Sequence, residues 1–176
     1  ASQQAAATRL DSLARDEERL NGLIARLEAE AARTGTTGPG TIVEGSMGSL
    51  DWPVEGEVLY RFGRQAGPDD TVIRQNGIGI RAPVGTPVRA VASGTVQHAG
   101  PFGTYGQTVL LDHGGGYYTL YLYLSRVNVQ VGGVVEMGQT VGLSGGANSD
   151  EGPHLEFQIR GQGGIALDPE LWLRRR

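Results

Sequence analysis

Histidine and cysteine, which serve in many zinc sites, are few in this chain of 176 amino acids. It contains three histidines, His98, His113 and His154, and no cysteine. A catalytic zinc ion needs about three protein ligands and an open position for water, and the absence of cysteine excludes thiolate ligands. Only His154 has a carboxylate at the spacing of a strand, because Glu156 follows two residues later. The chemistry that the sequence offers is therefore concentrated around these two side chains.

The other two histidines have simpler explanations. His113 stands in a Gly-rich segment, where we expect it to stabilise a turn, and His98 ends a predicted strand, where we expect it at the surface. Ser125 and Asp112 are not spaced for a Ser–His–Asp triad. A metal site reassembled from the remaining histidines is kept as an alternative.

The segment 154–160 alternates polar and apolar side chains, as a half-buried strand does. Its polar face carries His154, Glu156, Gln158 and Arg160. The apolar residues between them point to the opposite face. The segment therefore predicts a strand with a polar row on one side and the core on the other.

These side chains need a scaffold, and from residue 50 onward the sequence predicts an all-β domain. Short apolar runs are separated by glycines at close spacing, which is typical of small antiparallel strands. The predicted strands cover residues 88–92, 95–98, 108–112, 117–124, 127–131, 134–137, 140–143 and 155–160. The clearest hairpin joins 108–112 to 117–124 through three glycines, which adopt the positive φ of tight turns without strain.

The first 33 residues predict a long helix. Its apolar residues fall on an a/d spacing, with Glu17 at the remaining seam position; they are Leu10, Leu13, Leu20, Ile24, Leu27 and Ala31. At 1.5 Å per residue such a helix spans roughly 45 Å, and we interpret residues 1–33 as the C-terminal part of a coiled coil. The alternative is a single amphipathic helix packed on its own domain. Residues 34–49, rich in Gly, Thr and Ser, are predicted to be a flexible linker, and residues 50–176 form the β domain.

Composition narrows the classes of partner. The chain carries 19 acidic and 15 basic residues, a formal charge of −4, which does not favour nucleic acid. No apolar run approaches the roughly 18 residues of a membrane span, so we expect none. All of the basic residues other than histidine are Arg, whose planar guanidinium binds carboxylates in a bidentate manner.

Seven blocks of sequence, in a fixed order, resemble the lysostaphin/LytM-type zinc peptidase domain. They are GIGIRAPVGTPVRA (77–90), ASGTV (92–96), YG (105–106), LDHG (111–114), YLYL (121–124), GQTVG (138–142) and PHLEF (153–157). The resemblance implies a mainly β fold, a small antiparallel sheet of the duplicated hybrid motif type, preceded here by the long helix.

The resemblance also shows where the family's zinc ligands would stand. Active members use a His, an Asp four residues later, and the second His of a His-x-His strand. These positions correspond to Gln75, Gly79 and Glu156, and the position of a further catalytic His corresponds to Tyr123. A neutral amide is a poor ligand, Gly has no side chain, and one carboxylate does not hold zinc tightly. We therefore expect a degenerate domain with no metal, no cofactor and no peptidase activity, although His154 keeps the first His of the pair.

The same resemblance predicts which side chains line the former cleft. The positions of His154 and Glu156 line it in active relatives, so the polar row should face it. From the neighbouring strand we expect Tyr121 and Tyr123, and from the opposite wall Gln75 and Arg81. Tyr and Arg are frequent anchors of protein interfaces, and we predict a partner-binding groove. The simpler alternative is that Arg160 pairs with Glu156 or faces solvent.

A coiled coil followed by a degenerate LytM domain resembles the murein hydrolase activators of the EnvC type. This implies a non-catalytic activator of peptidoglycan (N-acetylmuramoyl-L-alanine) amidases in cell division, which binds the amidase regulatory helix in the groove. It also implies a periplasmic location in a Gram-negative bacterium and a link to the FtsE–FtsX complex through the coiled coil upstream. The N-terminal helix could fold back over the groove. The alternatives are a residual zinc endopeptidase and a peptidoglycan-binding scaffold.

Overall fold

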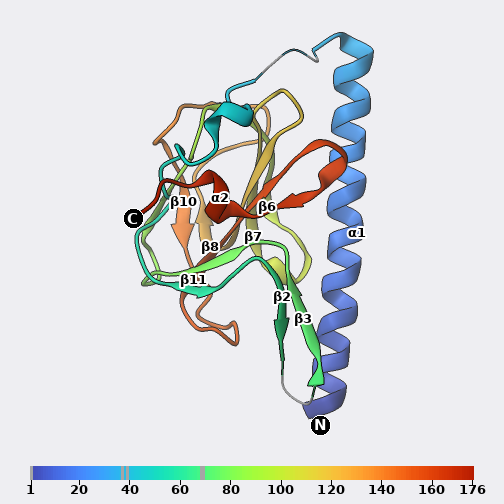
Figure 1. Cartoon of the computed structure of the whole chain (residues 1–176), viewed down its shortest axis with the longest axis vertical. Coiled ribbons are helices and arrows are strands. Elements are labelled where there is room, and N and C mark those ends of the chain that lie inside the picture. The colour runs from blue at the N-terminus through green and yellow to red at the C-terminus, as the bar shows by residue number, and fades with distance from the viewer. Residues whose placement is uncertain (1, 37, 39, 68–69) are drawn as a thin grey trace.

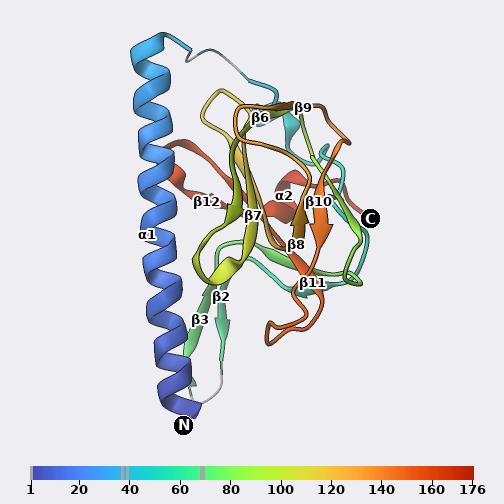
Figure 2. The same cartoon turned by 180° about the vertical axis from the view of Figure 1, so that it is seen from behind.

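A computed structural model describes residues 2–36, 38, 40–67 and 70–176. Helix α1 (Ser2–Thr34) stands along one side of a β domain that contains the strands (Figures 1 and 2). This confirms the long N-terminal helix and the mainly β architecture. Among the described residues, no helix combines the length and the hydropathy needed to cross a lipid bilayer.

The β domain is built on an antiparallel sheet with the strand order β1-β4-β11-β8-β7-β6-β9. In addition, β10 pairs with β5 and β8, β12 pairs with β11, and β2 and β3 form a separate hairpin beside the N-terminal part of α1 (Figure 1). The strands are β1 (Val58–Tyr60), β2 (Gly63–Ala66), β3 (Val72–Gln75), β4 (Ile78–Arg81), β5 (Pro87–Arg89), β6 (Gly94–Pro101), β7 (Gln107–Asp112), β8 (Tyr118–Val127), β9 (Val134–Val135), β10 (Thr140–Ser144), β11 (His154–Arg160) and β12 (Ala166–Leu167). The short helical segments are η1 (Glu44–Ser46), η3 (Gly103–Tyr105), η4 (Gln162–Gly164) and α2 (Pro169–Trp172).

The predicted strands are largely present, with two differences. The hairpin of β7 and β8 forms as expected, whereas the predicted strand 127–131 is wrong, because β8 continues to Val127 and the chain then turns. The strands β1 to β4 and the short strand β12 were not predicted. They are at most four residues long and three of them contain Arg, so the apolar runs used for the prediction do not mark them.

The sheet separates two apolar clusters. The main core contains Phe157, Tyr121 and Ile80. The second cluster joins α1 to the other face, where Leu120 and Leu122 of β8 pack with the α1 residues. Both clusters arise from strand alternation, since successive side chains of β8 and β11 point to opposite faces.

Helix α1 uses its apolar stripe to bind its own domain. Leu20 and Ile24, four residues apart and thus on one face, are at most 1% exposed, and Leu13 and Leu27 pack around them. The structure therefore adopts the alternative in which an amphipathic helix packs on the β domain. Leu10, expected in the same seam, is 60% exposed. That residues 1–33 are the C-terminal part of a coiled coil stays a prediction.

From Thr41 onward the chain packs on the β domain, which differs from the flexible linker predicted over residues 34–49. Thr41 N–H donates to the His113 carbonyl at 2.8 Å, and Ile42 is completely buried in the main core. Leu50 forms a bridge with Leu173 near the C-terminus. The domain thus begins at about Thr41, and residues 35–40 connect it to α1.

Candidate functional site

The polar residues of β11 lie on one face of the strand, as the alternation predicts. His154, Glu156, Gln158 and Arg160 are all at most 5% exposed, while the residues between them belong to the main core. In the neighbouring strand β8, Leu122, Leu120 and Tyr118 lie opposite the last three of these side chains. We call the four polar side chains the polar row. It is a buried row beside the cluster that holds α1.

Hydrogen bonds join the polar row along its length. The Tyr60 hydroxyl donates to Glu156 Oε1 at 2.8 Å and lies 3.0 Å from His154 Nε2. Gln158 Nε2 donates to Glu156 Oε2 at 2.6 Å, and Gln158 Oε1 accepts from Arg160 Nε at 3.1 Å and Nη2 at 2.7 Å. Because a carboxylate accepts from two sides, Glu156 holds the Gln158 amide with its oxygen toward Arg160.

Arg160 ends the polar row in an ion pair with α1. Its Nη1 and Nη2 donate to the two carboxylate oxygens of Glu17 at 2.5 and 2.8 Å, and Nη1 also donates to the Gly164 carbonyl at 3.1 Å. The Arg160 side chain is 1% exposed and that of Glu17 is 26% exposed. The expected alternative, a pair with Glu156, is wrong, because Gln158 stands between the two charges. The seam residue Glu17 is the partner.

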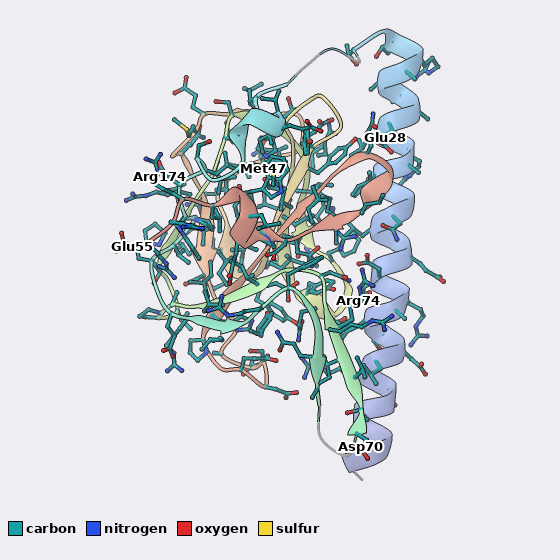
Figure 3. All side chains as sticks on the ribbon, in the orientation of Figure 1. Glu28, Met47, Glu55, Asp70, Arg74 and Arg174 are labelled. Atoms are coloured by element: carbon teal, nitrogen blue, oxygen red, sulfur yellow. The ribbon has the colours of Figure 1, made fainter. Side chains whose placement is uncertain are left out.

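Further polar contacts hold α1 on either side of this pair. Asp16 accepts from the Thr104 backbone N–H of η3 at 2.8 Å and from the Thr104 hydroxyl. Glu28 accepts from the Gly163 N–H of η4 at 3.0 and 3.1 Å, and Figure 3 shows it where the η4 loop reaches α1. Nearer the N-terminus, Arg9 pairs with Asp150. Burial would raise the pKa of Asp16, but hydrogen bonds from Thr104 and Arg19 more than offset this and lower it.

The zinc ion that the resemblance implies does not fit these residues. A Cβ atom added to Gly79 would lie 2.2 Å from the Tyr60 ring, so Tyr60 fills the space of a ligand side chain at that position. Glu156 is held by two donors, and burial raises the pKa of its carboxyl. Gln75 is on the β2–β3 hairpin, paired with Gly63. Within the described ranges, no group of three His, Asp or Glu side chains could hold a metal ion.

Tyr121 does not lie in the groove, which corrects the sequence expectation. Its ring packs against Phe157 in the main core, with centroids 5.5 Å apart, and its hydroxyl accepts from the Val91 N–H at 3.1 Å. The reason is a bulge in β8: between the pairs Val109–Tyr121 and Gln107–Leu124, two residues of β8 oppose one of β7. The extra residue shifts the alternation by one position.

Tyr123 does reach the face of the polar row, because it sits at this bulge with a φ of 61°. Its ring lies 4.9 Å from the His154 ring and 5.9 Å from the Tyr105 ring, centroid to centroid. Burial raises the pKa of Tyr123 to about 12, so its hydroxyl is neutral. A pocket of about 500 Å³ opens beside it, lined among others by Arg9, Tyr105 and Ser149.

Arg81 and the remaining histidines take no part in the polar row. Arg81 lies opposite His154 in the sheet, but its side chain is 65% exposed and pairs with Glu57 at 2.9 Å. His113 is buried, with Nδ1 2.8 Å from the Ser93 carbonyl and Nε2 2.6 Å from the Thr119 hydroxyl. His98 is half-buried beside the carbonyls at the end of β6.

Tyr60 is the site residue that the sequence reasoning missed. It belongs to β1, one of the short strands that the apolar pattern does not mark. A glycine inside a strand often indicates close approach by another group. Gly79 was therefore the available signal, and the approaching group is Tyr60, its partner in the β1–β4 pair.

Comparison with known proteins identifies relatives of the chain. A profile of the family described as Peptidase family M23 matches residues 74–169. The murein hydrolase activator EnvC of Escherichia coli K12 is 35% identical over 198 residues, covering 94% of this chain and 46% of EnvC. The cell division protein DipM of Caulobacter vibrioides is 37% identical over 123 residues, covering 68% of this chain and 19% of DipM.

The fold has counterparts among solved structures. The catalytic domain of lysostaphin from Staphylococcus simulans superposes with a TM-score of 0.56 at 31% identity, over 65% of this chain and 89% of that one. This confirms the LytM/lysostaphin-like fold. The chain spans less than half the length of either relative, EnvC or DipM.

Proposed function

Because the chain belongs to peptidase family M23, yet presents side chains unsuited to zinc at the positions assigned to the metal, we propose that it is a non-catalytic activator of peptidoglycan amidases. The observation that carries the proposal is the buried polar row ending in Arg160, whose guanidinium holds a carboxylate of a helix. Such a face binds amphipathic helices. The description of EnvC as a murein hydrolase activator supports the same role.

In the proposed mechanism, the amidase displaces α1 from the polar row. The amidase contributes its regulatory helix, which would otherwise lie across its own active site. A binder shifts such an equilibrium only by its differential affinity for the two states, and a change from 1:99 to 99:1 requires about 5.5 kcal/mol. Two or three aromatic or Arg anchors supply energies of this size. Arg160 and Tyr123 are the anchors we assign.

We extend the proposal to the cellular setting on the resemblance to EnvC-type activators. The protein would act in the periplasm of a Gram-negative bacterium, at sites of septal cell-wall splitting. A coiled coil upstream of α1 would connect it to the FtsE–FtsX complex. The description of DipM as a cell division protein supports this setting.

A murein-clearing assay tests the proposed function. Purified protein is incubated with dye-labelled murein alone, with a peptidoglycan amidase from the same bacterium, and with zinc added. We expect no dye release by the protein alone and increased release when the amidase is present. Dye release by the protein alone would indicate a zinc endopeptidase. Binding to murein without any effect on the amidase would indicate a scaffold, and either result would overturn the proposal.

A further inference from the structure

The contacts of α1 with the polar row and the second apolar cluster indicate which side chains a helix must present to bind there. We infer that the groove recognises partner helices by a defined register of carboxylate and aliphatic side chains, and that α1 carries a copy of this pattern in residues 16–28. The pattern is Asp-Glu-x-x-Leu-x-x-x-Ile-x-x-x-Glu. The inference rests on the proposed function for the identity of the partner, and it adds the chemistry that the partner helix must present.

The first requirement is a carboxylate opposite Arg160. The guanidinium is almost completely buried, and its other contacts are the neutral oxygens of Gln158, Gly164 and Asn21. The nearest carboxylate on its own strand, Glu156, is engaged by Tyr60 and Gln158. A helix without an acidic residue at this point would leave a buried cation without a partner, which is strongly unfavourable.

The second requirement is a pair of aliphatic residues at fixed distances from that carboxylate. Leu20 and Ile24 follow Glu17 by three and seven residues, which places all three on one face of the helix. They pack against Tyr105, Leu110, Tyr118, Leu120 and Leu122. The polar row and these five apolar residues have fixed positions in the domain. If the acidic residue stood one position earlier or later in the helix while Leu20 and Ile24 kept their contacts, it would point about 100° away from Arg160.

The third requirement sets the direction of the helix. Asp16, just before Glu17, accepts from the Thr104 N–H of η3, and Glu28, eleven residues after Glu17, accepts from the Gly163 N–H of η4. In η4, Gly163 and Gly164 have φ values of 74° and 78°, a conformation that favours glycine. A helix entering in the opposite direction would not present carboxylates to these two loops in register with Arg160.

The inference is tested with synthetic peptides of residues 8–36 and the full chain carrying Leu20→Asp and Ile24→Asp, which weaken docking of its own α1. We expect the unaltered peptide to bind in a fluorescence anisotropy titration. The Glu17→Gln peptide should bind at least tenfold more weakly. The matched control is Glu18→Gln, since Glu18 is exposed, and it should bind as the unaltered peptide does. Equal binding of the two substituted peptides would overturn the inference.

A second measurement keeps the inference testable if the doubly substituted chain does not fold. Amide hydrogen exchange of α1 is compared in full chains that carry Glu17→Gln or Glu18→Gln as their only change. We expect exchange at least tenfold faster in α1 of the Glu17→Gln chain, with β11 unaffected. Equal exchange in the two chains would overturn the carboxylate requirement.

Competition in the amidase assay separates this inference from the proposed function. The unaltered peptide should suppress amidase stimulation by the doubly substituted chain, and the Glu17→Gln peptide should not. If the peptides discriminate but the amidase is never stimulated, the inference stands and the proposed function fails. If the amidase is stimulated and neither peptide competes, the proposed function stands and the inference fails.

Discussion

At the scale of single residues, Glu156, one of the positions that the resemblance assigns to a zinc ligand, belongs to a hydrogen-bonded unit. Gly79 leaves room for the Tyr60 ring, and the Tyr60 hydroxyl occupies one side of the Glu156 carboxylate. Within the described part of the chain, no buried side-chain polar atom lacks a hydrogen-bond partner. A satisfied network of this kind holds side chains in single orientations, and here it presents Arg160 to the helix.

Gly79→Ala should destabilise the protein. The added methyl group collides with the Tyr60 ring, and overpacking of a filled site costs about 1–3 kcal/mol. The control is Gly22→Ala in α1, where the added Cβ meets nothing within 4 Å and the change should stabilise the helix by about 0.5–1 kcal/mol. Urea unfolding measures both. Equal stability of Gly79→Ala and the unaltered protein would contradict the packing described here.

Tyr123→Ala should reduce amidase stimulation at least tenfold without unfolding the domain. Tyr123 is half-buried at the edge of the polar row. Its truncation should therefore weaken partner binding more than it lowers the stability of the domain. Arg160 is a poorer test, since its burial makes loss of folding the expected result. The control is Arg89→Ala, because Arg89 is exposed on β5. Normal stimulation by Tyr123→Ala would argue against the groove.

His113 should make the protein less stable in acid. Burial lowers the pKa of His113 from 6.5 to about 4, so between these values the unfolded chain binds a proton that the folded chain does not. Stability therefore falls as the pH drops from 6.5 to 4, by about 3 kcal/mol in total, and stays level above 6.5. Glu156, whose pKa is raised by burial, contributes in the opposite direction. Comparison with a His113→Gln variant isolates the histidine, and that variant should show a flatter pH profile. An unchanged profile in this variant would contradict the assignment to His113.

At the scale of elements, the sequence predicted the strands that bury apolar residues and the helix with an apolar stripe. Alternation gave the correct faces of β11, which is regular. It placed Tyr121 on the wrong face because the bulge in β8 is made by Leu122 and Tyr123. Positive φ is usually signalled by glycine or asparagine, and neither marks this bulge. The a/d spacing of α1 predicted that its apolar stripe packs against another surface. It did not distinguish a second helix from a sheet, because both offer similar apolar surfaces.

Ile24→Ala should loosen α1 from the sheet. Ile24 is fully buried, and truncating a buried Ile costs about 2–5 kcal/mol. In this protein the loss should reduce the free energy with which α1 packs on the β domain. Limited proteolysis between α1 and Thr41 should become faster while the β domain stays intact. Leu10→Ala is the matched control, because Leu10 is largely exposed and its loss should change the cleavage rate little. Similar cleavage rates for the two variants would show that the apolar stripe does not hold the helix.

At the scale of the whole molecule, the two apolar clusters lie on opposite faces of one sheet. Removing α1 exposes the second cluster but leaves the main core, with Phe157 and Ile80, in place. The β domain can therefore open its groove without losing its own packing. The exchange of helices that we propose requires this division.

A covalent lock between α1 and the β domain should abolish amidase stimulation. The chain has no cysteine, so Arg9→Cys with Asp150→Cys introduces a single pair of thiols on the two sides of this contact, which a reducible bifunctional thiol reagent can span. The crosslinked protein should be inactive, and reduction of the crosslinker should restore stimulation. The single-cysteine variants serve as controls. Full stimulation by the locked protein would show that α1 need not leave the groove.

The anchoring of Thr41 to His113 also sets how long an open state can last. Residues 35–40 extend to about 20 Å at most, and loops of about ten residues close within roughly 10–100 ns. Under the proposed mechanism, a released α1 would stay within reach of its groove and would dock again once the amidase dissociates. The protein would therefore return to its resting state without any further signal.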